Sequence, residues 1–341
     1  MLNSTVEKRR KEGSGEVFKR AIVIDACGGP ISSENLEALK AGVTATQITL
    51  SHSQTPETWH QTLKTIYDHY TLRETLPDKA TLVEKAEDIQ EAKQSGRIGM
   101  VFALQNCALI GYDISLLSIL HKLGLRVTQL TYNETNYIGD GCVSRDDRPL
   151  THFGKQVVRE LNRLGIVVDL SHCGVSSSLS ALEVSTKPVV FSHSDVFSIT
   201  PNPRCVRDEQ IKAIARNGGV IGVSPFSPMC SPGGGKRPTI EDYLNHIDYI
   251  SELVGIDHVA IATDIFEQLT AFKWNSTSKR RYPEVMGQFT FETLYAEGFS
   301  HIHEIANVAS GLADRGYKDY ETEKVLGKNL LRIYQENWER S

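Results

Sequence analysis

The chain alternates short apolar runs with longer segments in which apolar residues recur at helical spacing. Short β-branched runs are typical of buried strands, and a 3.6-residue period is typical of amphipathic helices. The pattern predicts strands at 21–25, 43–50, 98–104, 125–130, 165–173, 188–194, 220–224 and 258–263. It predicts helices at 4–19, 56–73, 85–95, 114–122, 151–164, 175–186, 208–217 and 240–254, with further helix toward the C-terminus.

This alternation continues without a linker rich in Pro, Gly and Ser. Strands that alternate regularly with helices favour an α/β fold with a parallel sheet, and eight such units make a (β/α)₈ barrel. We therefore expect a single TIM barrel over 20–341, including C-terminal helices, and an N-terminal helical extension over 1–19.

Two neighbouring strands each end in Ser-His, in the stretches 165–173 and 188–194. A helix-length segment separates them, so they form a parallel βαβ unit that places His172 and His193 side by side at one sheet edge. A lone histidine there most often satisfies nearby backbone groups. Two histidines at the same position on adjacent strands instead indicate a site that holds a metal ion or a reacting oxygen.

Polar side chains also follow the other predicted strands, and in a TIM barrel the active site lies at these C-terminal ends. Two imidazoles and a carboxylate at a barrel mouth can bind zinc and leave one position open for water. The carboxylate of Asp264 either binds the metal or accepts a proton from the attacking water; otherwise it caps the following turn. Arg204 either binds a substrate carboxylate or pairs with Asp208 at the surface. The expected site comprises Cys27, Gln105, Tyr132, His172, His193 and Asp264, with Arg204 at the rim.

The composition argues against a nucleic-acid partner, a membrane anchor and a disulfide framework. The 341 residues carry 37 Lys and Arg against 42 Asp and Glu, and no basic run is interleaved with aromatic residues, so a nucleic-acid partner is not expected. No apolar run is long enough to span a bilayer, and the first residues lack the apolar region of a signal peptide, so we expect a cytoplasmic protein without a membrane anchor. The six cysteines contain no CxxC pair and are expected to be free thiols.

Several long stretches make the chain resemble the membrane (renal) dipeptidase family of metal-dependent amidohydrolase barrels. The resemblance covers about 20–338, and its most specific stretches are 154–172, 203–204, 217–223, 242–250 and 327–332. It implies hydrolysis of dipeptides by a pair of zinc ions. It further implies that His172 and His193 are metal ligands, that Asp264 is a ligand and general base, and that Arg204 binds substrate.

The chain departs from that family pattern at three places. Cys27, Gly28 and Gly29 stand where the family has His-x-Asp, Gln105 replaces the bridging Glu, and Tyr132 replaces a His that polarises the substrate. A neutral amide binds zinc more weakly than a carboxylate. We therefore expect zero or one zinc ion per chain, held by His172 and His193 with help from Gln105 or Asp264. Cys27 either adds a thiolate ligand or is a small buried apolar residue.

Three functions fit these observations. The first is a single-metal, dipeptidase-like hydrolase of a small peptide or amide. The second is a non-hydrolytic enzyme on a peptide-like metabolite, with Tyr132 as acid and Cys27 or Asp264 as base or nucleophile. The third is a catalytically silent binding protein. The loops 137–149 and 225–238 are expected to select the substrate, and the resemblance raises the possibility of a homodimer.

Overall fold

Eight parallel strands run around a barrel in the computed structural model, which describes residues 13–51, 58–266 and 269–338. A bridge between Gly28 and Ile265 brings the first and last strands together, and Asp264 N donates to Cys27 O over 2.8 Å. A further short strand, β3 (Ala80–Leu82), pairs only with β4. The barrel strands are β1 (Ile24–Gly28), β2 (Ala45–Thr49), β4 (Ile98–Leu104), β5 (Leu125–Gln129), β6 (Val167–Asp169), β7 (Val190–Phe191), β8 (Val220–Val223) and β9 (Val259–Ile261).

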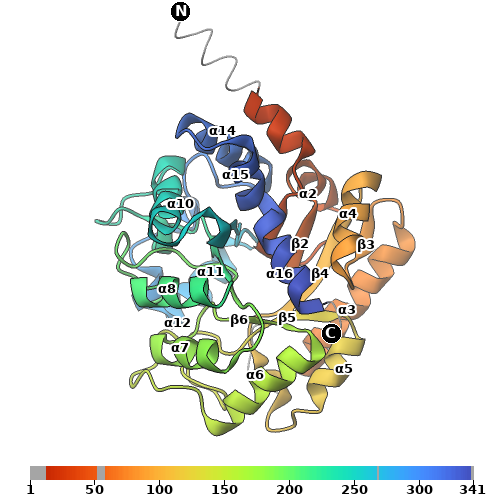
Figure 1. Ribbon diagram of the computed structural model, residues 1–341, viewed down its shortest axis with the longest axis vertical. Helices are drawn as coiled ribbons and strands as arrows, with labels where there is room; N and C mark the ends of the chain where they lie inside the picture. The colour runs from red at the N-terminus through yellow and green to blue at the C-terminus, as the bar shows by residue number, and fades with distance from the viewer. Residues whose placement is uncertain (1–12, 52–57, 267–268, 339–341) are drawn as a thin grey trace, which may run out of the picture.

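Helices form a ring outside the strands (Figure 1). Local sequence fixes their ends: in α6, the Thr151 hydroxyl accepts from Gly154 N at the start, and Gly165 terminates the helix at φ 75°. The ring contains α2 (Leu36–Gly42), α3 (Thr58–Thr75), α4 (Ala86–Ser95), α5 (Leu116–Lys122), α6 (His152–Leu164), α7 (Val175–Val184), α8 (Asp208–Arg216) and α10 (Ile240–Val254).

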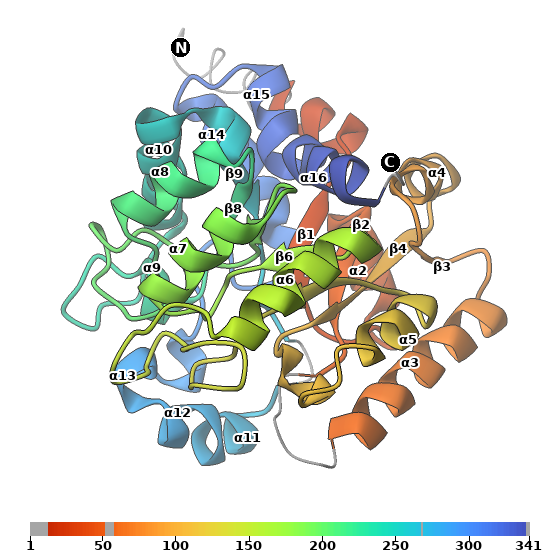
Figure 2. The ribbon, with the colours of Figure 1, turned by 60° about the horizontal axis from the view of Figure 1, so that its bottom comes forward.

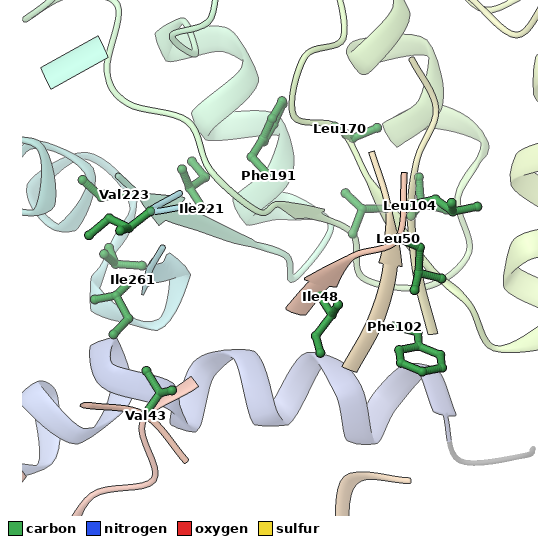
Figure 3. Close-up of a cluster of buried hydrophobic side chains, with 14 of the residues drawn as sticks. Val43, Ile48, Leu50, Phe102, Leu104, Leu170, Phe191, Ile221, Val223 and Ile261 are labelled. Carbon is green, nitrogen blue, oxygen red and sulfur yellow. The ribbon is translucent and has the colours of Figure 1, made fainter. Parts of the chain in front are cut away.

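The strands bury two apolar layers, because their side chains alternate in direction. In β4, Met100 and Phe102 belong to the outer core between the strands and the helices, whereas Val101 and Ala103 belong to the inner core. Figure 3 shows part of the outer core, including Phe102 and Ile221 on different strands. Small inner side chains let the strands close around a filled interior.

Different segments cover the two ends of the barrel (Figure 2). At one end lies α16 (Asn329–Trp338), whose Tyr334 hydroxyl accepts from Gln47 Nε2 over 2.8 Å. At the other end lie three short helices that follow β9, and this segment is the lid of the barrel. They are α11 (Ala271–Ser276), α12 (Ser278–Arg281) and α13 (Pro283–Met286). The remaining elements are α9 (Ser227–Cys230), α14 (Ala306–Asp314), α15 (Asp319–Glu323), a π-helical turn at Lys324–Lys328 and short 3₁₀ turns.

The predicted (β/α)₈ barrel is confirmed, with local differences. Strand β3 was not predicted, because three residues are too few to show a pattern. The strands that carry the two histidines are shorter than expected, since side-chain hydrogen bonds replace ladder bonds at their ends. Residues 13–20 are helical, whereas the earlier part of the helix predicted at 4–19 lies outside the described residues. Among the described helices, none combines the length and apolar character needed to cross a bilayer.

Candidate active site

A cavity of about 410 Å³ opens at the C-terminal ends of the strands, beneath the lid. Five of the predicted site residues line it: Gln105, Tyr132, His172, Arg204 and Asp264. The other two, Cys27 and His193, contact members of this set from the cavity floor. The barrel thus brings all seven predicted residues together.

Cys27 lies between the amide of Gln105 and the carboxylate of Asp264. Gln105 Nε2 donates to its sulfur over 3.1 Å, and the sulfur lies 3.6 Å from Asp264 Oδ1. Cys27 Sγ, a ring nitrogen of His193 and a carboxylate oxygen of Asp264 all lie within 4.8 Å of one another. Thiolate, imidazole and carboxylate are the three ligand types that zinc accepts in proteins.

The two histidines point the same ring nitrogen at each other, with their Nε2 atoms 2.9 Å apart. His172 Nδ1 lies 2.6 Å from Asn133 Oδ1. A carbonyl oxygen can only accept, so Nδ1 carries the proton and Nε2 of His172 keeps its lone pair.

A similar contact fixes the tautomer of His193. Ser192 Oγ donates to the carboxylate of Asp169 over 2.5 Å, so it accepts from His193 Nδ1, 2.7 Å away. Nε2 of His193 is then also unprotonated. Two lone pairs 2.9 Å apart repel unless both face one cation, so the residues present fit a metal ion.

Burial sets the charge states around these atoms. It lowers the pKa of His193 well below its ordinary value, and the positive charge of Arg204 acts in the same direction. It raises the pKa of Asp264 to about 7, although Arg204 and the bond from Cys27 oppose the rise. Burial also raises the pKa of the Cys27 thiol, with the nearby carboxylates, first that of Asp264, adding to the shift. A cation at this place would reverse the cost of ionising Asp264 and Cys27.

Arg204 is 5% exposed, and its guanidinium donates to the carbonyl of His193 over 3.1 Å. It does not pair with Asp208, whose carboxylate instead accepts from Tyr249 and Ser198. No described carboxylate forms an ion pair with Arg204, so a buried positive charge faces the cavity.

Backbone strain is concentrated at the same site. Three described non-glycine residues have positive φ, and two of them are His172 (67°) and Asp264 (50°). Such conformations cost about 1–3 kcal/mol and persist where the surroundings enforce them, commonly at functional sites. The strain at Asp264 is held by the bonds from its N to Cys27 O and from the Tyr295 hydroxyl to its own carbonyl.

Sequence reasoning missed most of the cavity wall. Aromatic residues surround the polar floor, and three of the six come from the lid and the segment after it. None of the lining residues belongs to the loop 137–149, whereas Phe226 and Met229 come from the loop 225–238. The aromatic residues are Tyr132, Phe226, Phe266, Trp274, Tyr282 and Tyr295. Tyr132 stacks on His172 with ring centroids 4.1 Å apart.

A second buried group of Asp195, Cys230 and His246 has ligand atoms within 4.8 Å of one another. His246 Nδ1, however, accepts from Val196 N over 3.0 Å. The neutral ring therefore carries its proton on Nε2, and no lone pair is offered to a metal. This group fits a structural role in the core.

Comparison with known proteins agrees with this geometry. Dipeptidase tcpJ from Claviceps purpurea is 27% identical over 269 residues, which are 78% of this chain and 57% of the relative. Dipeptidase ataJ from Aspergillus terreus is 28% identical and covers 82% of this chain and 68% of its own length. The chain thus spans little more than half of tcpJ and about two thirds of ataJ.

Solved structures share the whole barrel. An amidohydrolase from Pseudomonas aeruginosa superposes with a TM-score of 0.86 at 30% identity, covering 95% of this chain and 99% of that one. A metallo peptidase from Rhodobacter sphaeroides, bound to a phosphinate mimic of L-Ala-D-Ala, shares the fold with a TM-score of 0.78 at 17% identity, covering 93% and 100%. The family model described as membrane dipeptidase matches residues 34–289. Because that match covers most of the barrel and includes both strand-end histidines, the chain belongs to the membrane dipeptidase family, peptidase family M19.

Proposed function

We propose that the protein is a metal-dependent hydrolase of a small peptide or amide, working with at most one zinc ion per chain. The observation that carries this proposal is the approach of the two Nε2 atoms to 2.9 Å, while each Nδ1 faces an oxygen. The residues that would hold the ion are Cys27, His193 and Asp264, together with His172, whose Nε2 faces that of His193; Gln105 lies beside Cys27.

The space around Gly29 supports one ion rather than two. A Cβ atom at Gly29 would lie 3.1 Å from Cδ1 of Phe266, so a ligand side chain there meets an aromatic ring. Asp264 is the only carboxylic acid among the described residues that line the cavity. Two divalent ions would therefore be poorly neutralised.

The chain's own residues can perform the remaining steps of amide hydrolysis. Bound zinc supplies Lewis acidity, which polarises a carbonyl and acidifies water. The carboxylate of Asp264 can accept a proton from the attacking water and return it to the leaving amine. Arg204 binds a substrate carboxylate, and Tyr132 is placed beside His172 to donate to the oxygen on which charge develops.

The test is metal analysis of protein purified without chelators, combined with an assay of dipeptide hydrolysis before and after chelation. We expect at most one zinc per chain, lost in His193→Ala and retained in His152→Ala, whose side chain is exposed on α6. Two tightly bound ions per chain would contradict the proposed count. Zinc without hydrolysis of any amide would favour the non-hydrolytic enzyme or the silent binding protein.

The cytoplasmic location and the homodimer stay predictions. So does the division into a 1–19 extension and a 20–341 barrel.

A further inference from the structure

The charges around the cavity are unusual for a site that receives a free peptide amine. Asp264 is the only acid among the described lining residues, and its carboxylate already faces Cys27. Three lining residues are cationic, and two of these, Arg204 and Lys273, form no ion pair with a described carboxylate. The third, Arg281, pairs with Glu134 over 2.7 Å.

Among the residues that the structure describes, a free α-ammonium group entering this cavity would find no carboxylate beyond Asp264. It would also meet the buried guanidinium of Arg204, which forms no close ion pair with a described carboxylate and whose charge is screened little by solvent. The same guanidinium attracts a carboxylate and can bind it through two hydrogen bonds. The cavity therefore discriminates between the two ends of a dipeptide.

The wall adds a second preference. The indole of Trp274 and the rings of Phe226 and Tyr282 are buried and lie in the roof of the cavity with Met229 and Met286. Burying an aromatic side chain against such a surface contributes about 1.5–3 kcal/mol, which a small side chain cannot match.

We propose that the substrate is an amide without a free ammonium group: an N-acylated amino acid whose carboxylate binds Arg204 and whose large apolar side chain packs against the aromatic wall. This inference rests on the proposed function, and it specifies the substrate class of the same site. Hydrolysis breaks the bond between the acyl carbon and nitrogen; water supplies hydroxyl to the acyl carbon and a proton to the departing amine, giving a carboxylic acid and a free amino acid.

The test compares two ligands of nearly equal shape. N-isobutyryl-phenylalanine differs from the dipeptide Ala-Phe by a methyl group in place of the ammonium group. Affinity is measured by calorimetry on the zinc-loaded protein, with kcat/KM as the measure for a compound that turns over. We expect the isobutyryl compound to be favoured by about tenfold or more, and to be favoured over N-isobutyryl-alanine by a similar factor.

Two charge-reversal variants on the lid test the effect of positive charge in the cavity, one at a lining residue and one at a residue that does not line it. Lys273 and Arg280 are both exposed, but only Lys273 lines the cavity. Lys273→Glu is expected to shift the preference toward Ala-Phe by about threefold to tenfold, whereas Arg280→Glu leaves the ratio within about twofold of wild type. Arg204→Gln is expected to weaken N-isobutyryl-phenylalanine while leaving its primary amide unaffected.

The outcomes separate this inference from the proposed function. Equal or tighter binding of Ala-Phe, or no binding of either ligand at millimolar concentration, would overturn the substrate class even if other amides are hydrolysed. A clear preference for the acylated ligand without any turnover would support the substrate class and refute the hydrolase.

Discussion

Asn133 provides the sharpest test of how the site is built. Its side chain is 1% exposed, and its oxygen accepts from His172 Nδ1 over 2.6 Å. Asn133→Leu removes this acceptor from the buried N–H, and losing such a partner costs about 1–3 kcal/mol. Partners of metal-binding histidines typically contribute about 10–100-fold in metal affinity, which is about 1.4–2.8 kcal/mol. We therefore expect the zinc dissociation constant to rise by about one to two orders of magnitude.

Asn133→Asp should act in the opposite direction. A carboxylate accepts the same proton more strongly and makes the imidazole a better ligand, so zinc should bind about threefold to tenfold more tightly. The metal-free Asp variant should unfold more easily, because its buried carboxylate has no cation to face. Zinc affinity is measured by competition with a chromophoric chelator, and the fold is checked by circular dichroism.

Cys142→Ala is the matched control. Cys142 Sγ also donates to Asn133 Oδ1, over 3.2 Å. Its removal should leave zinc affinity within about threefold of wild type. If Asn133→Leu binds zinc as tightly as wild type, or if the Asp variant binds it more weakly, the tautomer reasoning is wrong.

Three other predictions follow from single contacts. Gly29→Asp, combined with Gln105→Glu and Cys27→His, should bind a second zinc ion only when Phe266→Ala is added, as measured by elemental analysis, because the Phe266 ring occupies the space beside Gly29. His246 is neutral in the core and has a pKa of about 4 instead of 6.5, so the unfolded chain takes up its proton first. Stability should thus fall by up to about 3 kcal/mol as pH drops from 6.5 to 4, and His246→Gln should remove this component in urea titrations; parallel pH profiles for the two proteins would contradict it. Gly222→Ala should abolish soluble expression, because its Cβ would clash with the carbonyl oxygen of Ser192, whereas Gly15→Ala has open space and should behave as wild type.

The barrel and its polar floor could be predicted from the sequence because both depend on local patterns. Apolar runs mark the strands, and polar residues at their ends mark one rim. His172, His193 and Asp264 could therefore be assigned to one site without any distances. The serine of the second Ser-His ending also has a role in the site, since Ser192 fixes the tautomer of His193.

The cavity wall could not be predicted in the same way. Trp274 lies on α11 and Tyr282 lies between α12 and α13, and the positions of these short lid helices depend on contacts made across the barrel mouth, not on a repeating pattern. The hydrogen-bond partners of Arg204 could not be predicted from the sequence either. Its sequence neighbour Asp208 offered an ion pair, and only the fold shows that Asp208 turns to Tyr249 instead.

The division between floor and lid has a consequence for how such proteins diversify. The residues suited to bond breaking are fixed to strand ends, while those that shape the cavity belong largely to one continuous segment after β9. Mutations in that segment can therefore accumulate with little effect on the folding of the barrel, and a new ligand preference can arise by changes within this one segment. The substrate preference of such an enzyme could therefore change in evolution while its catalytic residues stay the same.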